Sequence, residues 1–415
     1  MFSIKSLAEK AKTACFQLSA LSAQQKDKVL VDMANKLRTN CASILLENIK
    51  DLDLATKYQL SEAMIDRLRL TKERIEDIAE AIEKIAEQEN PVGKVKQTYQ
   101  LENGLNVQKL SIPLGVIAMI YESRPNVTAD AAALCFKAGN AVILRGGKEA
   151  LHSNIAIGNA LHQALIDNNI SEGAIGIVSD ADRKHMAELL HLDQLVDLII
   201  PRGGESLIRY VSEHSRIPVI QHYKGVCHCY IDKDADIDKA IRILLNGKVQ
   251  RPGVCNSLET LLIHKTFMNE HFSKIVAALE ENQVKVHACK NTFDYFSNAR
   301  IATEADYHAE YLALEIAIKQ VDNLPQAIDH IHEFTSDHTE VIVTEKQQTA
   351  DQFVQSINSS VVMVNASSRF SDGGQLGLGA EIGISTSKLH AYGPMGAESL
   401  TSEKFVVIGD GQIRN

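Results

Sequence analysis

The stretch IPLGVIAMIYESRPNVTADAAALCFKAGNAVILRGGKEA, from Ile112 to Ala150, decides the fold class. It begins with a continuously apolar run, GVIAMIY, continues through an alanine-rich segment, and ends with a second apolar run, AVILR. Strands that are apolar on both faces are typical of parallel sheets covered by helices. The stretch therefore predicts a strand, a helix and a second strand of a doubly wound α/β sheet, which binds ligands beyond the carboxyl ends of its strands.

The same alternation continues toward the carboxyl end, where AIGIVSD, VDLIIPRGG and IPVIQH are expected to be strands. A second αβ region is expected from about residue 225 to 357. On the amino side, residues 3–89 have apolar side chains at helical spacing, which predicts an all-helical segment. A Glu-Asn-Gly bend predicts an antiparallel hairpin over about 95–111, and EKFVVIGDGQI near the end predicts a further strand.

Composition limits the class of protein. A chain of 415 residues is long enough for two or more domains, and 45% hydrophobic with 23% charged residues is typical of a globular protein. No apolar run approaches the ~18 residues of a membrane span, and the amino terminus lacks the apolar core of a secretory signal. Seven scattered cysteines indicate a reducing compartment, so we expect a cytoplasmic protein. The net charge of -10 argues against nucleic acid as a partner.

Two glycine-rich turns follow predicted strands. One contains Arg145, Gly146, Gly147 and Lys148, and the other contains Arg202, Gly203 and Gly204. Glycine lets the backbone approach a phosphate, and the cations and the following helix terminus favour its charge. Both turns fit equally well as ordinary tight turns with solvated cations. The common G-x-G-x-x-G fingerprint is absent from every strand end in this region, and no G-x-x-x-x-G-K-[ST] motif occurs.

Asn126 follows Pro125 and precedes a predicted helix. Asparagine is a favourable N-cap, so a purely structural role fits the local sequence. Its amide NH₂ could instead donate a hydrogen bond to an oxyanion that forms on an attacked carbonyl. The local sequence slightly favours the N-cap role and leaves the other interpretation open.

Cys255 lies in KVQRPGVCNSLETLLIH, between a Pro252–Gly253 bend and a predicted buried strand. Cysteine is often a small buried hydrophobe, and local sequence alone favours that interpretation. The bend and the polar residues Asn256 and Ser257 favour an exposed thiol instead. A thiol with a usual pKa near 8.5 needs a cation, a helix end or a positively charged cofactor ring to become a nucleophile at neutral pH.

Other potential metal ligands are not expected to form a metal site. In GVCHCYID, Cys227 and Cys229 share one face of a strand and His228 points to the other, which favours core packing. His330, His332 and His338 have no accompanying ligand spacing and are expected at the surface. We therefore predict no metal.

Taken together, the motifs resemble the aldehyde dehydrogenase superfamily. The resemblance is carried by long segments in the same order: the opening stretch, IPRGGESLIRYV, GKVQRPGVCNSLETLLIH, and GLGAEIGISTSKLHAYGPMGAESLTSEKFVVIGDGQIR. It implies an NADP-binding domain over 1–224, a catalytic domain over 225–357, and a return segment over 358–415 that ends in a strand. The hairpin and this strand would form a β oligomerisation arm of a homo-oligomer, a dimer or a tetramer.

The resemblance also implies roles for single residues. Cys255 matches the nucleophile, and Asn126 matches the oxyanion donor, with the Cys255 N–H as the second donor. The turn from Arg145 to Lys148 matches the place of the adenosine ribose, where its cations suit a 2′-phosphate and favour NADP(H) over NAD. The turn from Arg202 to Gly204 matches the neighbourhood of the pyrophosphate. Glu310, in HAEYLALEI, matches the glutamate that holds the nicotinamide ribose.

One departure from the superfamily pattern concerns the reaction. Hydrolytic members have a water-activating glutamate in an E-L-G-G stretch, whereas this chain has QHYKGVC, with His222 near the position of the glutamate. An enzyme that exchanges its acyl group with phosphate needs no activated water. The resemblance therefore implies NADPH-dependent reduction of L-glutamyl 5-phosphate to L-glutamate 5-semialdehyde through a cysteine thioester, in proline biosynthesis. The alternatives are a hydrolytic NAD(P)-dependent aldehyde dehydrogenase and a non-catalytic protein that keeps the fold.

Four further residues are candidates for binding the phosphate or carboxylate of this substrate. They are Arg124, Arg251, Asn365 and Arg369. A kinase that produces the acyl phosphate, glutamate 5-kinase, is a candidate partner, and no membrane partner is expected.

Overall fold

The computed structural model describes residues 2–221 and 223–414, which divide into two compact units. One unit contains the chain up to Gln221, together with Gly377–Gly383 and the stretch from Met395 onward. The other unit contains the chain after Gln221 as far as Leu376, together with Ile384–Pro394. The sequence predicted the first domain boundary after residue 224, whereas the first unit ends slightly earlier, at Gln221. Residues 358–376, which were expected in the return segment, belong to the second unit.

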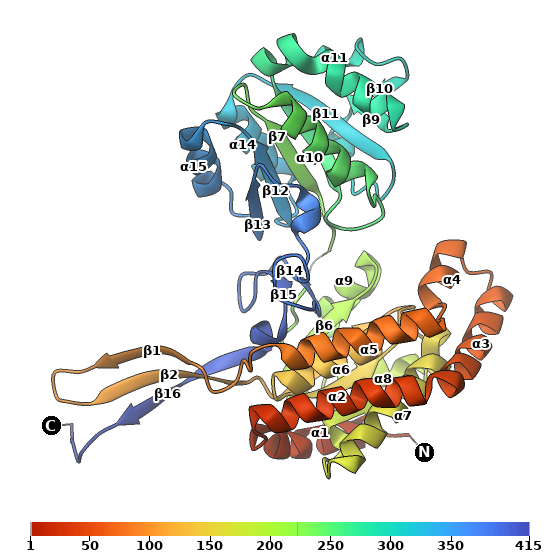
Figure 1. The fold of residues 1–415 in the computed structure, drawn as a ribbon, viewed down its shortest axis with the longest axis vertical. Helices are drawn as coiled ribbons and strands as arrows, with labels where there is room; N and C mark the ends of the chain where they lie inside the picture. The colour runs from red at the N-terminus through yellow and green to blue at the C-terminus, as the bar shows by residue number, and fades with distance from the viewer. Residues whose placement is uncertain (1, 222, 415) are drawn as a thin grey trace. The chain divides into compact units, whose positions relative to one another are not determined.

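A four-stranded parallel sheet forms the centre of the first unit, with the order β5-β4-β3-β6 (Figure 1). Its strands are β3 (Val116–Tyr121), β4 (Ala141–Arg145), β5 (Ile175–Ile177) and β6 (Leu198–Arg202). The chain proceeds outward from β3 to β5 and then returns to the other side of β3. The carboxyl ends of β3 and β6 are therefore a topological switch point, the usual ligand-binding place in wound sheets.

The predicted strand at IPVIQH is wrong. Among residues 217–221 of this segment, only Val219 makes a bridge, to Ile199 of β6. Ile217 and Ile220 are buried, so the apolar pattern marked burial correctly. Pro218, however, has no N–H to donate to a ladder, which limits the pairing to an isolated bridge.

The predicted helical segment at the amino end is confirmed. It forms α1 (Ile4–Ser19), α2 (Ala23–Thr39), α3 (Cys41–Lys57), α4 (Glu62–Leu68) and α5 (Lys72–Glu87). The side chains of Ser3, Ser22, Ser61 and Thr71 cap four of these helices. The helices that connect the strands are α6 (Pro125–Lys137), α7 (Leu151–Asp167), α8 (Arg183–Leu189) and α9 (Glu205–His214). A single turn of 3₁₀ helix, Lys148–Ala150, precedes α7.

A three-stranded antiparallel sheet forms an arm of the first unit (Figure 1). It consists of β1 (Val95–Gln100), β2 (Asn106–Pro113) and β16 (Thr401–Ile408), in the order β1-β2-β16. Gly104, in the bend between β1 and β2, has a φ of 86°, a conformation that favours glycine. The predicted hairpin and the predicted carboxyl-terminal strand are therefore confirmed, and they pair with each other through β2.

The second unit contains a seven-stranded parallel sheet with the order β10-β9-β11-β8-β7-β12-β13. Its strands are β7 (Cys227–Ile231), β8 (Leu258–His264), β9 (Lys285–Ala288), β10 (Ala299–Ile301), β11 (Glu315–Val321), β12 (Thr339–Val343) and β13 (Val361–Val364). The helices are α10 (Ile237–Val249), α11 (Lys265–Glu281), α12 (Lys290–Phe293), α13 (Glu304–Tyr307), α14 (Leu324–Phe334) and α15 (Gln347–Ser356). Two short strands, β14 (Gly383–Ser385) and β15 (Gly393–Met395), pair separately.

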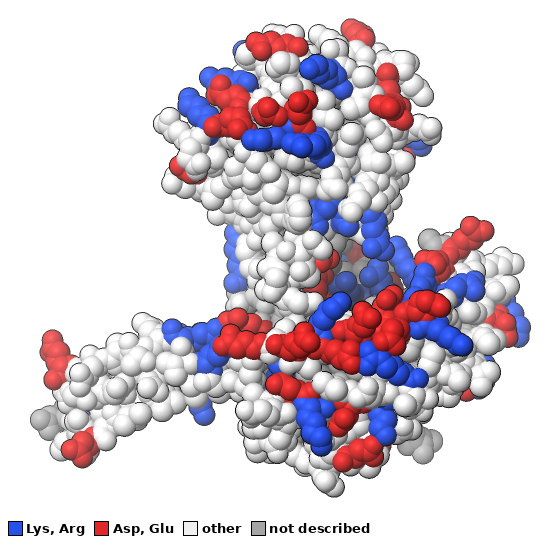
Figure 2. Space-filling view, viewed as in Figure 1, with Lys and Arg blue, Asp and Glu red and all other residues white. Residues whose placement is uncertain are grey.

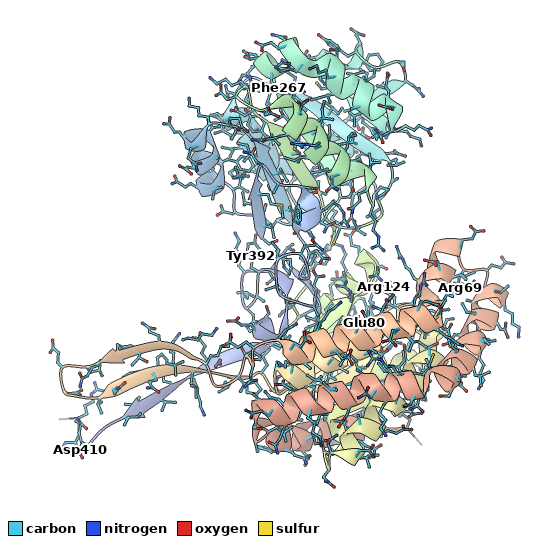
Figure 3. All side chains as sticks on the ribbon, in the orientation of Figure 1. Arg69, Glu80, Arg124, Phe267, Tyr392 and Asp410 are labelled. Atoms are coloured by element: carbon cyan, nitrogen blue, oxygen red, sulfur yellow. The ribbon has the colours of Figure 1, made fainter. Side chains whose placement is uncertain are left out.

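The two faces of this sheet pack against different helices. One apolar cluster combines Cys227 and Cys229 with Phe267, which is labelled in Figure 3, and other residues of α10 and α11. The opposite face packs against α14 and α15. His228 bonds to the buried Glu340 on the neighbouring strand, with 2.8 Å between Nδ1 and Oε2. The predicted packing of the Cys-His-Cys segment in the core is confirmed.

The histidines predicted at the surface are a correction. His330 and His338 are buried, and only His332 is exposed. His330 lies with Ala327, Ile331 and Phe334 on the buried face of α14. Burial, assisted by the positive charge of neighbouring groups, lowers the pKa of His330 to about 2, so the ring is neutral. The i, i+3, i+4 spacing of these residues was the overlooked signal of burial.

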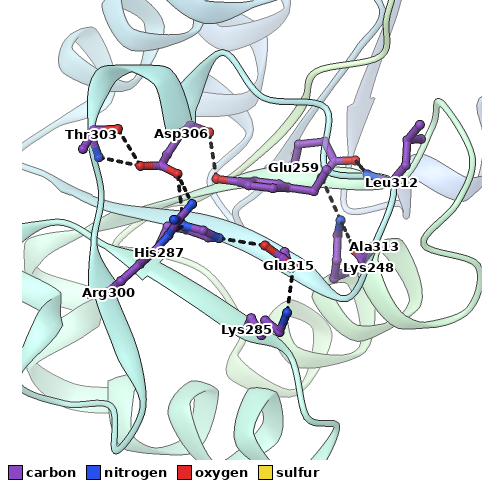
Figure 4. A network of polar contacts seen from close by, with 11 residues as sticks. Lys248, Glu259, Lys285, His287, Arg300, Thr303, Asp306, Leu312, Ala313 and Glu315 are labelled. Atoms are coloured by element: carbon purple, nitrogen blue, oxygen red, sulfur yellow. Dashed lines mark hydrogen bonds and ion pairs between the residues drawn. The ribbon is translucent and has the colours of Figure 1, made fainter. Parts of the chain in front are cut away.

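A buried ion pair joins the end of α10 to the beginning of β8. The Nζ of Lys248 lies 2.8 Å from Oε2 of Glu259, and both side chains are 0% exposed. Lys248 also donates to the carbonyl oxygen of Ala313 at 3.1 Å (Figure 4). Burial lowers the pKa of Lys248 and raises that of Glu259 to about 7, while each charge favours the other. The ion pair joins the two ends of the turn that contains Cys255. The bond from Lys248 to Ala313 connects this turn to the segment before β11.

We expect Lys248→Met to lower the free energy of unfolding by about 3–5 kcal/mol, because Glu259 would be left buried without a counter-charge. The double variant Lys248→Met with Glu259→Leu should recover most of this loss, since it removes both desolvation costs. Urea unfolding of the single and double variants measures the difference. A double variant no more stable than the single one would contradict this role for the pair.

Candidate active site

Cys255 lies half-buried in the turn between α10 and β8, as the Pro252–Gly253 bend predicted. Gly225, just before β7, packs directly against the backbone of this turn. A Cβ atom on Gly225 would lie 1.9 Å from the carbonyl oxygen of Cys255, so only glycine fits there. The Cys227 thiol donates to the same carbonyl oxygen at 3.2 Å. The main chain at Cys255 is thus held from the neighbouring strand.

Glu310 reaches the same place from the segment before β11. Its Oε1 accepts a hydrogen bond from the Gly225 N–H at 2.8 Å. Lys224 supports this segment by donating from Nζ to the carbonyl oxygen of His308 at 2.8 Å. The structure therefore brings two residues that are predicted for the site, Cys255 and Glu310, into contact with the same glycine.

Arg369 contacts the turn that contains Cys255, through Asn256, the next residue in the chain. Its Nη1 donates to the side-chain oxygen of Asn256, and its Nε donates to Oε1 of Gln250 at 2.9 Å. Burial and the neighbouring Arg251 lower the pKa of Arg369, whereas Asp372 and a thiolate at Cys255 raise it. Of the predicted substrate-binding cations, Arg251 lies in the same turn as Cys255, and Arg369 bonds to the residue after it.

The buried Asn256 joins the turn of Cys255 to the segment after β13. Its Nδ2 donates to the carbonyl oxygen of Ser371 at 2.9 Å, and its own carbonyl oxygen accepts from Oγ of Ser368 at 2.6 Å. Asn365, also predicted to bind substrate, has a different role. Its Oδ1 accepts from the Thr344 N–H and its Nδ2 donates to the Thr344 carbonyl, so its amide serves the backbone.

In the first unit, Asn126 lies exposed near the carboxyl end of β3, at the switch point. The N-cap of α6 is Arg124, which is labelled in Figure 3, and Pro125 occupies the first turn. The N-cap role considered for Asn126 is therefore wrong, because proline prefers the first helical position and shifts the cap to the residue before it. The Nδ2 of Asn126 donates to Oδ2 of Asp130, one turn along the helix, at 2.9 Å.

Asp130 fixes the orientation of the Asn126 amide. Nδ2 of Asn126 donates to this carboxyl group, which sets which end of the side-chain amide is the NH₂ and which is the carbonyl. Burial raises the pKa of Asp130 to about 6, while the hydrogen bond from Asn126 and the charge of Arg202 oppose the rise. Arg202 also lies 3.7 Å from Glu381.

The turn after β4 places Arg145 near a second cation, Arg183 at the beginning of α8. Burial lowers the pKa of Arg145, Glu149 opposes this, and Arg183 lowers it further. The carboxylate of Glu149 accepts from the N–H and hydroxyl of Ser123 at 3.0 and 2.7 Å. Lys148 instead lies over the ring of Tyr58, 4.8 Å from its centroid. Two cations beside a fixed carboxylate can hold a phosphate and a sugar hydroxyl.

Both glycine turns already contain a carboxylate of the chain itself. A Cβ on Gly147 would lie 2.1 Å from Oε1 of Glu149, and one on Gly203 would lie 2.7 Å from Oε2 of Glu122. The Gly204 N–H, at the beginning of α9, donates to Glu122 at 3.0 Å. The glycines therefore make room for carboxylates as well as for a ligand.

Sequence reasoning missed Gly225, Asp130, Glu149 and Glu122. Of these residues, Asp130 could most readily have been predicted, because it lies four residues after Asn126 on a predicted helix, and side chains at that spacing are neighbours. The other three act through contacts between distant segments. His222 lies outside the described residues. Within residues 2–221 and 223–414, no group of three His, Cys, Asp or Glu side chains could hold a metal ion.

Comparison with known proteins places the chain. The model of the aldehyde dehydrogenase family matches residues 3–294. A gamma-glutamyl phosphate reductase of Colwellia psychrerythraea is 57% identical over 414 residues, with 100% of this chain and 99% of the relative covered. The same name is given to a protein of Idiomarina loihiensis that is 54% identical, with 99% of both chains covered. None of the described helices has the length and apolar character needed to cross a membrane.

Solved structures agree. A crystal structure of gamma-glutamyl phosphate reductase from Thermotoga maritima has a TM-score of 0.97 and 40% identity over 100% of both chains. An acetylating aldehyde dehydrogenase from Geobacillus thermoglucosidasius, 18% identical, shares the fold with a TM-score of 0.70 over 99% of this chain and 97% of its own. The predicted fold class is confirmed, and the chain belongs to the aldehyde dehydrogenase family, among relatives called gamma-glutamyl phosphate reductase.

Proposed function

We propose that the protein reduces L-glutamyl 5-phosphate to L-glutamate 5-semialdehyde and phosphate in proline biosynthesis, with NADPH as the reductant. Full-length relatives named gamma-glutamyl phosphate reductase support the substrate. The observation that carries the chemistry is the turn of Cys255, a half-buried thiol with Arg251 in the same turn and Arg369 bonded to the next residue, Asn256. Cations favour the thiolate, and Arg251 would also attract the acyl phosphate.

In the first step, the Cys255 thiolate attacks the acyl carbon of the substrate and a C–S bond forms. The Cys255 N–H would donate a hydrogen bond to the oxyanion. By likeness to the family, Asn126 would be the second donor, and Asp130 holds its amide in one orientation. The bond between the acyl carbon and the phosphate oxygen then breaks. Phosphate leaves with the electron pair, and a thioester on Cys255 remains.

Hydride transfer to the carbonyl carbon of this thioester is the chemistry that NADPH would supply when bound. The Cys255 thiolate would then be the leaving group as the aldehyde is released. Glu310, whose Oε1 accepts a hydrogen bond from the Gly225 N–H, would bind a ribose hydroxyl of the cofactor. The chain lacks the water-activating glutamate of hydrolytic relatives at QHYKGVC, so the thioester survives until it is reduced.

Phosphate dependence tests this reaction in the reverse direction. Wild-type protein supplied with glutamate semialdehyde and NADP should form NADPH only when phosphate or arsenate is present, because phosphate must accept the acyl group. Cys255→Ser should lower the rate by about 10³-fold or more, since a hydroxyl is a far weaker nucleophile than a thiolate. Equal oxidation without phosphate would instead identify a hydrolytic dehydrogenase, and an unchanged rate in Cys255→Ser would refute the thioester.

For the cofactor, we propose NADP(H) rather than NAD(H). Arg145 and Arg183 provide two positive charges near the turn after β4, which suits the 2′-phosphate of NADP. Glu149, which is fixed by Ser123, is a suitable acceptor for a ribose hydroxyl. The turn from Arg202 to Gly204 would lie near the pyrophosphate, with Arg202 providing the charge.

We expect Arg145→Ala to raise KM for NADPH about tenfold or more while changing KM for NADH by less than about twofold, because only NADPH has the 2′-phosphate. Lys5→Ala, which removes an exposed cation from α1, is the control. Steady-state kinetics with both cofactors provide the measurement. Equal effects on both cofactors would contradict the proposed recognition of the 2′-phosphate.

We also propose that the arm joins copies of this chain into a dimer or tetramer. Tyr99, Phe405 and Val407 are exposed, and the strand register places them on one face of the arm. Figure 2 shows that much of the visible arm surface carries no charge. A cluster of exposed apolar side chains on an edge strand is typical of an association surface. A cytoplasmic location fits the seven cysteines, each present as a thiol, and glutamate 5-kinase stays a predicted partner.

Val407→Asp combined with Phe405→Asp should lower the mass measured by light scattering after gel filtration, because the charges would be buried in the interface. Thr98→Asp, on the opposite face of the arm, provides the matched control. The control is expected to keep the wild-type mass. A double variant with the wild-type mass would exclude this face as the interface.

A further inference from the structure

A cavity of about 340 Å³ lies beside the nucleophile turn in the second unit. Its lining residues are Asn246, Gln250, Arg369, Phe370, Asp372 and Gln375. Asn246 and Gln250 come from the end of α10, and the others follow β13. Because Arg369 bonds to both Gln250 and Asn256, the cavity wall is directly connected to the residue next to Cys255.

The cavity contains one cation and one anion that are both held in place. Hydrogen bonds to Gln250 and Asn256 fix the plane of the Arg369 guanidinium. Oδ1 of Asp372 accepts from the N–H groups of Gly374 and Gln375 at 3.0 and 3.3 Å, which fixes the carboxylate. The negative charge of Asp372 favours the charged form of Arg369 and so raises its pKa. Phe370 adds an apolar surface, and the residue is 49% exposed.

We propose that this cavity binds the amino-acid end of the substrate, with Arg369 on the α-carboxylate and Asp372 on the α-ammonium group. This inference rests on the proposed function and adds the basis of its specificity. A zwitterion needs a cation and an anion close together, and this cavity provides both beside the thiol. Three methylene or methine carbons separate the reacting carbonyl from the α-carboxylate of the substrate, and Arg369 bonds to Asn256, the residue next to Cys255.

Asp372 would then distinguish an α-amino aldehyde from one without the amino group. Oδ1 of Asp372 serves the backbone turn, and an asparagine at this position keeps an oxygen there while removing the charge. Asp372→Asn therefore tests recognition of the ammonium group with little change to the loop. Arg369 would contribute to every substrate that has a carboxylate, whether or not it has an amino group.

The experiment compares kcat/KM for glutamate semialdehyde with kcat/KM for 5-oxopentanoate, which lacks the amino group, in the phosphate-dependent direction. Each aldehyde comes from one stock, so ring closure of the amino aldehyde affects all proteins equally. Asp372→Asn should lower the ratio of the two values by about tenfold to a hundredfold, the size of a lost charge-assisted contact. Arg369→Lys should lower activity with both aldehydes and leave their ratio within about twofold of the wild-type value.

Asp238→Asn, in the first turn of the same helix α10, is the control and should keep the wild-type ratio. A purely structural role for Asp372 would lower activity with both aldehydes equally and leave the ratio unchanged, which would overturn the inference. Wild-type protein without any phosphate-dependent reaction would refute the proposed function itself. An active wild type with an unchanged ratio in Asp372→Asn would refute only the assignment of the cavity.

Discussion

The ion pair between Lys248 and Glu259 is the constraint on which the candidate nucleophile depends. It is buried at both ends, and it connects the end of α10 with the beginning of β8 across the turn that contains Cys255. The bond from Lys248 to Ala313 extends this constraint to the segment of Glu310 (Figure 4). A buried pair gives little net stability, because desolvation offsets the attraction. Its value here is geometric, since it fixes the positions of two segments that must remain in register.

Parallel strand order explains why these segments meet. β11, β8 and β7 are neighbours, so the segments that enter them arrive at the same edge of the sheet. Gly225 precedes β7, where its N–H bonds to Glu310 and its missing side chain leaves space for the Cys255 backbone. The proposed nucleophile and the proposed cofactor-binding carboxylate thus both contact a position without a side chain.

The sequence predicted the features that depend on local pattern. The apolar runs at β3, β4 and β6 marked buried parallel strands, and the alternation of Cys227, His228 and Cys229 marked two faces of β7. The Pro252–Gly253 bend indicated an accessible thiol. Predictions failed where a second local rule competed, as with Pro218 against a strand and Pro125 against an N-cap at Asn126.

Contacts between distant segments could not be predicted. Nothing near Gly204 in the sequence indicates that its N–H bonds to Glu122, and nothing near Arg369 indicates that it contacts Asn256. The cavity beside Cys255 likewise combines the end of α10 with the segment after β13. Such sites depend on how elements pack, because their members share no spacing along the chain.

The central claim is that the turn makes Cys255 the reactive thiol of the protein. Four cysteines are half-buried, namely Cys15, Cys41, Cys255 and Cys289, so three of them serve as internal controls. Limiting iodoacetamide at neutral pH, followed by mass spectrometry of peptides, gives the relative alkylation rates. Because nearby cations favour the thiolate, Cys255 should react at least about tenfold faster than the other three. A rate for Cys255 equal to or below theirs would contradict its role as the nucleophile.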